Sequence, residues 1–297
     1  MRRYVLDLSR HSPKSLVGRA LRLLLPVITK GLAMPILRGP ARGLRWVIGT
    51  GIYGPWLGMY ESEKVRLLAG LLREGDVAYD IGAHAGYYTL VAARLVGRTG
   101  SVVAFEPNPE NIRALRRHLV LNRVQNVEVV EAAVSDRTGT ARFDDSDRSN
   151  SRGRLSYGGS LEVSCVALDA LIGGNGLPAP AVIKMDIEGG ECLAIDGARE
   201  LLVSARPMIL LATHGPAIRA RAKSLLRDIG YDMAPLAPSR DANKCSEWVC
   251  SPRPERKNRD SSVAPWLRKR PSSPASPAKT RPNWLSFSWR RATPSTE

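Results

Sequence analysis

Between residues 77 and 212, short apolar runs alternate with longer segments in which apolar residues recur every three or four positions. The short runs predict strands, and the longer segments predict amphipathic helices. This alternation is typical of a mostly parallel sheet with helices on both faces. We expect strands at 77–81, 102–106, 127–131, 182–186 and 208–212, and helices at 86–95, 109–122, 190–202 and 216–229.

Three segments add to this alternation. Residues 39–60 predict short strands and turns, and residues 61–72 predict an amphipathic helix. Between the third and fourth strands, Gly139 and the stretch 144–159 indicate a hairpin-like insertion. Asn108 directly before Pro109 predicts a sharp helix start, because Asn caps helices well and Pro suits the first turn.

The net charge of +16 is concentrated at the two ends of the chain. Residues 1–50 hold ten Lys and Arg against one acid, residues 252–297 hold eleven against three, and the middle is nearly neutral. We therefore predict a basic N-terminal extension (1–50), a globular domain (51–251) and a basic, disordered tail rich in Pro and Ser (252–297). The arms are interpreted as solvated tails, with contact to an anionic membrane surface as the alternative.

Cysteine usage and hydropathy give further bounds. The four cysteines have no zinc spacing and indicate reduced thiols in the cytoplasm. The most apolar stretch, 16–37, is interrupted by Arg, Lys and Pro, so it favours a packed or membrane-surface helix over a transmembrane one. No partner is evident for His11 or His118, which we expect at the surface or at an interface.

One segment carries most of the chemistry. An apolar run ends at Asp80, a glycine-rich turn runs from Gly82 to Gly86, and a helical pattern follows. The next apolar run ends at Glu106, twenty residues after Gly86. This layout predicts a nucleotide-binding turn, in which glycines let the backbone approach the ligand. Glu106 is placed to accept hydrogen bonds from both ribose hydroxyls.

The predicted ligand is a cationic nucleoside. A dinucleotide-binding turn reads G-x-G-x-x-G, whereas position 84 is His, and the charge of Asp80 would repel a pyrophosphate. S-adenosylmethionine has a positive amino group and no phosphate, and Asp80 would organise its amino-acid end, directly or through water. The other expected donor-binding residues are Gly82, Ala83, Gly86, Glu106, and Ala132 and Ala133 near the adenine.

Six strings occur along the chain in this order: Met59-Tyr-Glu61, Gly75-Asp-Val77, Asp80-Ile-Gly-Ala-His-Ala-Gly86-Tyr-Tyr, Phe105-Glu-Pro-Asn108, Leu168-Asp169 and Ile183-Lys-Met-Asp186-Ile-Glu188-Gly-Gly-Glu191. Together they resemble the FkbM family of methyltransferases over roughly residues 55–250. The resemblance implies the class I methyltransferase fold, a doubly wound, seven-stranded α/β sheet whose last strand is antiparallel. It also implies S-adenosylmethionine as methyl donor and O-methylation of a sugar, glycan or secondary metabolite.

Two positions depart from the family pattern. His84 stands where the family usually has Asn, which should alter a turn contact without abolishing donor binding. Ala212 stands where the family often has Glu at the end of the fifth strand. Any acid–base scheme that depends on that Glu is therefore in doubt for this chain.

The expected catalytic residues follow the fourth and fifth strands. Methyl transfer from a sulfonium releases a neutral thioether, so the protein must mainly align the acceptor and exclude water. A general base would add about 10²–10⁴-fold for a hydroxyl acceptor. If the two strands are adjacent, the side chains of Asp186 and His214 converge. We predict that His214 is the general base and that Asp186 orients either His214 or the acceptor. Glu188 is a third catalytic candidate. The alternative for His214 is a capping or solvent-facing loop side chain.

Two further points concern this end of the sheet. Glu188 and Glu191 with His214 would suit magnesium, but acids at a helix start are equally favoured by the helix dipole, and we predict no metal. The acceptor pocket is expected from residues 142–159, 53–60 and the loop after His214.

The sequence leaves other functions open. The basic arms are compatible with an RNA methyltransferase, although the neutral middle lacks a basic patch with interleaved aromatics, and we expect no nucleic acid. A non-catalytic, membrane-associated module is the other alternative, and an NAD-dependent oxidoreductase is disfavoured by Asp80 and His84. We expect a cytoplasmic protein, with peripheral membrane contact through the arms, that acts on a small-molecule or glycan hydroxyl.

Overall fold

A computed structural model describes residues 31–50, 55–58, 60–145, 153–156, 158–172, 176–236 and 246–254. Most of both basic arms, at 1–30 and 255–297, lies outside the described residues, as do Cys245 and part of the insertion. The predictions for these segments, including the disordered tail and its membrane contact, stay predictions. Among the helices of the described residues, none is long and apolar enough to cross a membrane.

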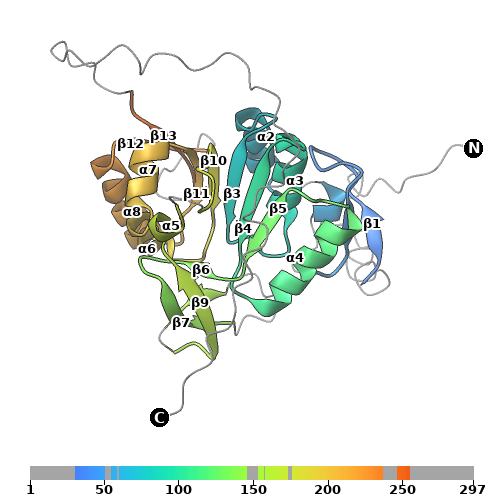
Figure 1. The fold of residues 1–297 in the computed structure, drawn as a ribbon, viewed down its shortest axis with the longest axis horizontal. Helices are drawn as coiled ribbons and strands as arrows, with labels where there is room; N and C mark the ends of the chain where they lie inside the picture. The colour runs from blue at the N-terminus through green and yellow to red at the C-terminus, as the bar shows by residue number, and fades with distance from the viewer. Residues whose placement is uncertain are drawn as a thin grey trace, which may run out of the picture.

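Seven strands form the central sheet, in the order β12-β13-β11-β10-β3-β4-β5 (Figure 1). Five of them pair in parallel, and β13 runs antiparallel between β11 and β12. This is the class I methyltransferase fold that the resemblance implied. The strands are β3 (Val77–Ile81), β4 (Ser101–Phe105), β5 (Val127–Val130), β10 (Val182–Met185), β11 (Met208–Ala212), β12 (Tyr231–Pro235) and β13 (Glu247–Pro252).

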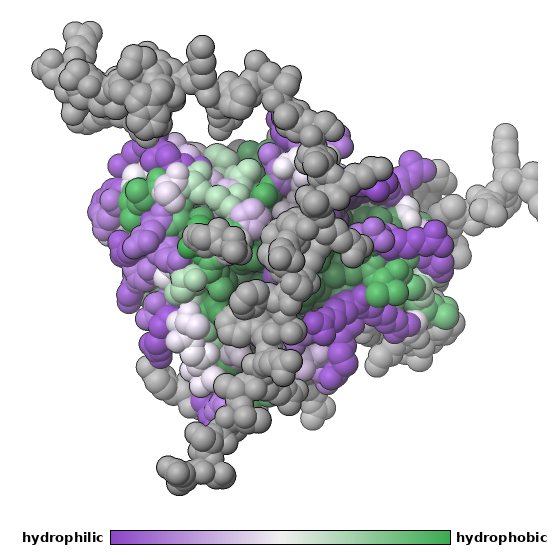
Figure 2. Space-filling view, in the orientation of Figure 1, coloured by the Kyte–Doolittle hydropathy of each residue, from purple (hydrophilic) through white to green (hydrophobic). Residues whose placement is uncertain are grey.

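Helices cover both faces of the sheet, because alternate residues of each strand point to opposite sides. On β3, Tyr79 and Ile81 pack with α6, α7 and α8, whereas Ala78 packs with α2 and α3. The polar outer faces of α8 and α4 carry the hydrophilic surface seen in Figure 2. The helices are α2 (Ser62–Leu71), α3 (Tyr87–Val96), α4 (Pro109–Leu121), α5 (Leu168–Leu171), α6 (Glu191–Asp196), α7 (Arg199–Ala205) and α8 (Pro216–Asp228).

One predicted helix is wrong. The segment 190–202 was expected as a single helix, but the chain forms α6 and α7 with a break at Gly197. A Cβ atom at position 197 would lie 2.1 Å from the carbonyl oxygen of Ser135. The backbone at Gly197 therefore packs directly against the backbone that follows strand β6 (Ala133–Val134), which leaves no room for a side chain. Asn108 does cap α4 as predicted, accepting hydrogen bonds from the backbone N–H groups of Glu110 and Asn111.

The insertion forms a second sheet rather than a simple hairpin. Its four strands have the order β6-β9-β7-β8, with β7 and β9 antiparallel and β6 and β9 parallel. Phe143 packs inside this small sheet with Val163 and Cys165. The sheet lies below the carboxyl ends of the main strands (Figure 1). Its strands are β6 (Ala133–Val134), β7 (Gly139–Asp144), β8 (Arg154–Leu155) and β9 (Leu161–Val166).

The segment before α2 is fixed to the glycine-rich turn through His118. It contains the antiparallel strands β1 (Ala33–Pro35) and β2 (Arg45–Val47) and a short 3-10 helix, η2 (Pro55–Leu57). The Val47 N–H donates to His118 Nε2 at 2.9 Å, and His118 Nδ1 lies 2.8 Å from the Ala85 carbonyl oxygen. His118 is fully buried and stacked on Trp46, so its expected surface position is wrong. Burial lowers the pKa of His118 to about 4, which keeps the ring neutral.

Candidate active site

A cavity of about 300 Å³ opens at the carboxyl ends of β3, β4, β10 and β11. Ligands of open α/β sheets bind at this edge, where the direction of strand order reverses. The wall takes residues from the glycine-rich turn, from the ends of the strands, from the segment around α2 and from the insertion. Of the predicted donor-binding residues, Gly82, Ala83, Glu106, Ala132 and Ala133 line it.

Glu106 is held rigidly at the end of β4. One carboxylate oxygen accepts the His84 backbone N–H at 2.7 Å, and the other accepts the Asn108 backbone N–H at 3.0 Å and the Asn111 amide at 3.2 Å. Its side chain is almost completely buried, and this burial raises the pKa of Glu106. These three bonds use three of the roughly four acceptor positions of the carboxylate, so a position remains on the oxygen that accepts the His84 N–H, and the fixed group is suited to accept a ribose hydroxyl there.

The turn between β3 and α3 depends on left-handed backbone at three positions. Gly82, His84 and Gly86 have φ values of 78°, 52° and 91°. Asn and His enter this region more readily than most residues, so His84 is compatible with this left-handed position of the turn. Gly86 does not line the cavity; a side chain there would lie 2.3 Å from Leu115, so this glycine serves helix packing.

Asp80 does not line the cavity. Its carboxylate is 2% exposed, accepts the Thr89 hydroxyl at 2.6 Å and lies 3.1 Å from the Lys184 ammonium. Lys184 in turn donates to the carbonyl oxygen of Gly82 at 2.6 Å and does line the cavity. The geometry therefore does not support a direct contact between Asp80 and a donor, and gives Asp80 the indirect task of fixing Lys184 under the turn.

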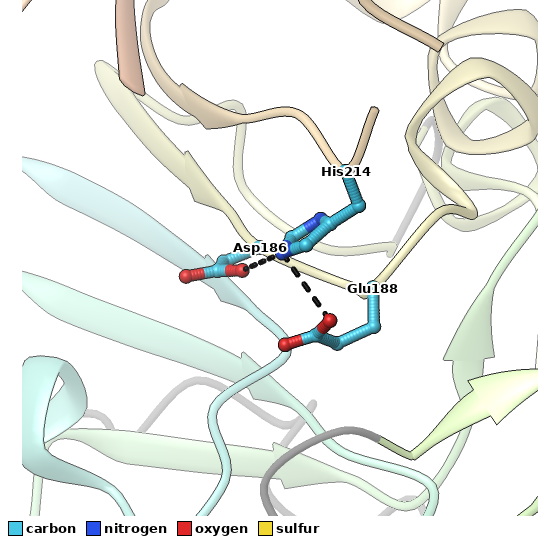
Figure 3. A group of neighbouring side chains, drawn as sticks. All are labelled: Asp186, Glu188 and His214. Atoms are coloured by element: carbon cyan, nitrogen blue, oxygen red, sulfur yellow. Dashed lines mark ion pairs between the residues drawn. The ribbon is translucent and has the colours of Figure 1, made fainter. Parts of the chain in front are cut away.

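Three side chains converge where β10 and β11 end (Figure 3). His214 Nε2 lies 3.6 Å from Asp186 Oδ1 and 3.3 Å from Glu188 Oε2. The predicted convergence of Asp186 and His214 is thus confirmed, because the two strands are adjacent and parallel. One ligand atom from each of the three residues lies within 4.8 Å of the others, a spacing that would also hold a metal ion.

The sequence indicated that Glu191 is one of several acids at a helix start, but in the structure its side chain points to His214. It is fully buried, and its Oε1 lies 2.7 Å from His214 Nδ1. This hydrogen bond, together with the charges of Glu191, Glu188 and Asp186, raises the pKa of His214 to about 8 against the opposing effect of burial. His214 is therefore mainly an imidazolium at neutral pH, whereas the sequence prediction assumed an ordinary value near 6.5.

Sequence reasoning missed a buried ion group beside this cluster. Lys64 from α2 is 3% exposed, and its ammonium lies 2.7 Å from Glu247, 3.1 Å from Glu61 and 3.5 Å from Asp186. Glu61 also accepts the Tyr88 hydroxyl at 2.5 Å. The only signal in the sequence was the string containing Glu61, since Lys64 reads as one polar residue of an amphipathic helix.

The charges around the cavity fit a cationic ligand. Carboxylates outnumber cations on the wall that the described residues form, and Lys184 and His214 supply the positive charge there. A sulfonium and an ammonium suit such a wall, whereas a pyrophosphate does not. The lining carboxylates are Glu61, Glu106, Asp186, Glu188 and Glu247.

A second hollow of about 540 Å³ adjoins the cluster on the side of the insertion. His214, Glu188 and Leu155 line both cavities, so the two cavities adjoin at these residues. Arg154, Leu155 and Ser156 from the insertion form its other wall. A molecule in the hollow would therefore lie beside His214 and Glu188.

Comparison with known proteins decides the family. The model of the Methyltransferase FkbM domain matches residues 80–233, just over half of the chain. The chain belongs to the FkbM methyltransferase family. The methyl donor of this family is S-adenosylmethionine, and the Glu106 carboxylate and the acidic wall suit it.

Individual relatives are distant in sequence and are matched over only part of their length. The hexuronic acid methyltransferase AglP of Haloferax volcanii is 27% identical over 152 residues, which is 50% of this chain and 61% of that protein. The 31-O-demethyl-FK506 methyltransferase FkbM of Streptomyces tacrolimicus is 29% identical over 162 residues, covering 43% of this chain and 62% of that protein. The chain thus matches about three fifths of the length of these curated relatives. A crystal structure of a methyltransferase FkbM from Methylobacillus flagellatus has a TM-score of 0.43 and 17% identity, covering 68% of this chain and 54% of that one.

Proposed function

We propose that this chain transfers a methyl group from S-adenosylmethionine to a hydroxyl group of a sugar, a glycan or a secondary metabolite. The observation that carries the proposal is the position of His214 with Asp186 and Glu188 on the wall of the cavity that also contains Glu106. Donor-binding and proton-accepting groups thus face one space.

The donor side is assigned to residues that the fold already fixes. Glu106 accepts the ribose hydroxyls, the backbone at Gly82 and Ala83 faces the methionine portion, and Ala132 and Ala133 border the adenine. When bound, S-adenosylmethionine supplies an electrophilic methyl group on a sulfonium. The acidic wall stabilises that positive charge.

His214 is assigned as the base that takes the hydroxyl proton. Its Nδ1 is engaged with buried Glu191, so Nε2 is the nitrogen that faces the acceptor side. Asp186 and Glu188 stabilise the imidazolium that forms on proton transfer, as their distances of 3.6 and 3.3 Å from Nε2 allow. Because the pKa of His214 is about 8, the reactive neutral form predominates only above that pH.

The acceptor class rests on the relatives and on the second hollow. The names of these relatives describe a hexuronic acid and 31-O-demethyl-FK506 as methylation targets. The hollow lined by Arg154, Ser156 and Glu188 offers polar groups to an acceptor with several hydroxyls. The acceptors to test are therefore neutral sugars, uronic acids and polyketides that carry a free hydroxyl group.

The test is a transfer assay with methyl-labelled S-adenosylmethionine, the full chain and a panel of glycans, uronic acid glycosides, polyketides and total RNA. We expect label in a hydroxylated small molecule or glycan, and none from His214→Ala. Label in RNA would favour the RNA methyltransferase alternative, and label in no member of the panel would favour an inert module. Unchanged turnover in His214→Ala would remove His214 from the mechanism.

A further inference from the structure

Lys64 connects three parts of the chain that are far apart in sequence. It lies on α2, Asp186 follows β10, and Glu247 begins β13. Both Lys64 and Glu247 lie outside residues 80–233, so the family match assigns neither of them. Their ammonium–carboxylate distance of 2.7 Å is the shortest of the three ion pairs that Lys64 makes.

The ammonium of Lys64 and the surrounding acids require one another. A buried ammonium is costly unless carboxylates compensate it, and here burial would lower the pKa of Lys64 whereas Asp186, Glu61 and Glu247 raise it. Without that ammonium, the three carboxylates, whose side chains are 23–33% exposed, would repel one another at short range. The group is therefore stable as a unit and is not explained by packing alone.

The carboxylate of Asp186 is divided between two partners. Its Oδ2 lies 3.5 Å from Lys64 Nζ, and its Oδ1 lies 3.6 Å from His214 Nε2. Lys64 does not line the cavity, whereas Asp186 and His214 do. An ammonium on the protein side thus fixes which oxygen of Asp186 faces the imidazole.

Glu247 is the anchor of Lys64, and it reaches the cavity from the neighbouring strand. In the register of β11 and β13, Glu247 is paired with Ala212, the position at which members of the family often have Glu. The side chain of Glu247 lines the cavity and contacts Lys64. The antiparallel strand therefore supplies a carboxylate at the level where β11 carries only a methyl group.

We propose that Lys64 and Glu247 are positioning residues of the methyl-transfer site: Glu247 anchors Lys64, and Lys64 holds the carboxylate of Asp186 ionised and oriented toward His214. This inference rests on the proposed function, because it assigns a task to Asp186 in that reaction. Neither Lys64 nor Glu247 takes part in the transfer itself.

The electrostatic surroundings agree with this assignment. Burial raises the pKa of Asp186, but Lys184, Lys64 and His214 outweigh it and lower the value below its usual range. Lys64 lowers the pKa of Asp186 both through its charge and as a hydrogen-bond donor. The titratable and charged groups that face the Lys64–Asp186 pair are Tyr60, Glu61, Tyr88, Lys184, Glu188, Glu191, His214 and Glu247.

The experiment is a carboxyl-¹³C NMR titration of the full chain, with the Asp186 signal assigned through Asp186→Asn. In Lys64→Met we expect the midpoint of Asp186 to rise by about one pH unit or more, because an adjacent cation lowers a carboxyl pKa by about 1–3 units. Lys64→Arg should retain most of the wild-type midpoint. The matched control is Lys223→Met, since Lys223 is exposed on α8 and should leave the midpoint unchanged.

A second pair of variants tests the proposal if Lys64→Met fails to fold. The double variant Lys64→Met/Glu247→Gln removes one positive and one negative charge, and its Asp186 midpoint should lie above that of Glu247→Gln alone. Equal midpoints in these two variants, or an unshifted midpoint in folded Lys64→Met, would overturn the positioning role. Donor uptake by the wild type is measured separately, so a failure of the proposed function is distinguishable from a failure of this inference.

Discussion

A side chain on Gly82 would place its Cβ 2.0 Å from the backbone carbonyl oxygen of Asp186. The end of β3 and the end of β10 therefore approach each other more closely than two ordinary residues allow. Since Gly82 belongs to the glycine-rich turn and Asp186 to the cluster with His214 and Glu188, this contact sets the spacing between the two sides of the cavity. The glycine is required by this backbone contact as well as by its φ of 78°.

Gly82→Ala should destabilise the protein by at least about 2 kcal/mol, because it combines left-handed backbone strain with a clash against backbone. Thermal unfolding followed by circular dichroism measures the change. Gly70→Ala is the matched control: Gly70 lies in α2 with open space around it, and the substitution should stabilise by up to about 1 kcal/mol. Equal melting temperatures for wild type and Gly82→Ala would contradict the close approach.

Glu106→Gln should weaken S-adenosylmethionine binding at least about tenfold, because the variant loses charged acceptors that face the ribose hydroxyls. Equilibrium dialysis with labelled donor gives the affinity. Glu63→Gln, an exposed change on α2, serves as the control and should have no effect. An affinity for Glu106→Gln equal to that of the wild type would show that Glu106 does not bind the donor.

The raised pKa of His214 predicts a pH-dependent contribution to stability. Its folded value of about 8 lies above the ordinary 6.5, so protonation favours the folded state. The contribution is fully present below pH 6.5 and is lost as the pH rises through 8, with a size of about 1–2 kcal/mol for a partly exposed group. Urea unfolding at pH 6 and pH 9 should show this loss in the wild type and not in His214→Gln. Parallel changes in both proteins would refute the assigned charge of His214.

Removal of divalent metals should leave donor binding and methyl transfer unchanged. Asp186, Glu188 and His214 have a spacing that would hold a metal ion, but Lys64 and the His214 imidazolium already balance these carboxylates. Exhaustive dialysis against a chelator, followed by the transfer assay, checks this. Activity lost on chelation and restored by magnesium would establish a metal site instead.

The parallel strands were predictable from the sequence because they are buried on both faces. The continuous apolar runs predicted both ends of β3 and β11 correctly, and they predicted the ends of β4, β5 and β10 to within one residue. The two edge-side strands were not found by pattern, since β12 carries Asp232 and Pro235 and β13 ends in Pro252. Their existence was implied only by the family resemblance.

The site was predictable where chemistry follows directly from strand ends. Glu106, Asp186 and His214 each come after an apolar run, and parallel strands bring such residues to one edge. Lys64 and Glu247 were not predictable, because their meaning depends on a contact between α2 and β13. The orientation of Asp80 was equally hidden, since only the neighbouring Lys184 shows that its carboxylate is already engaged.

The central claim is that the cavity beside Glu106 was built for a sulfonium nucleoside. Isothermal titration calorimetry of S-adenosylmethionine into the full chain tests it most directly. We expect saturable uptake of one donor per chain, together with uptake of the demethylated product, which retains the ribose that Glu106 binds. A flat titration with both compounds, in protein shown to be folded, would contradict the assignment.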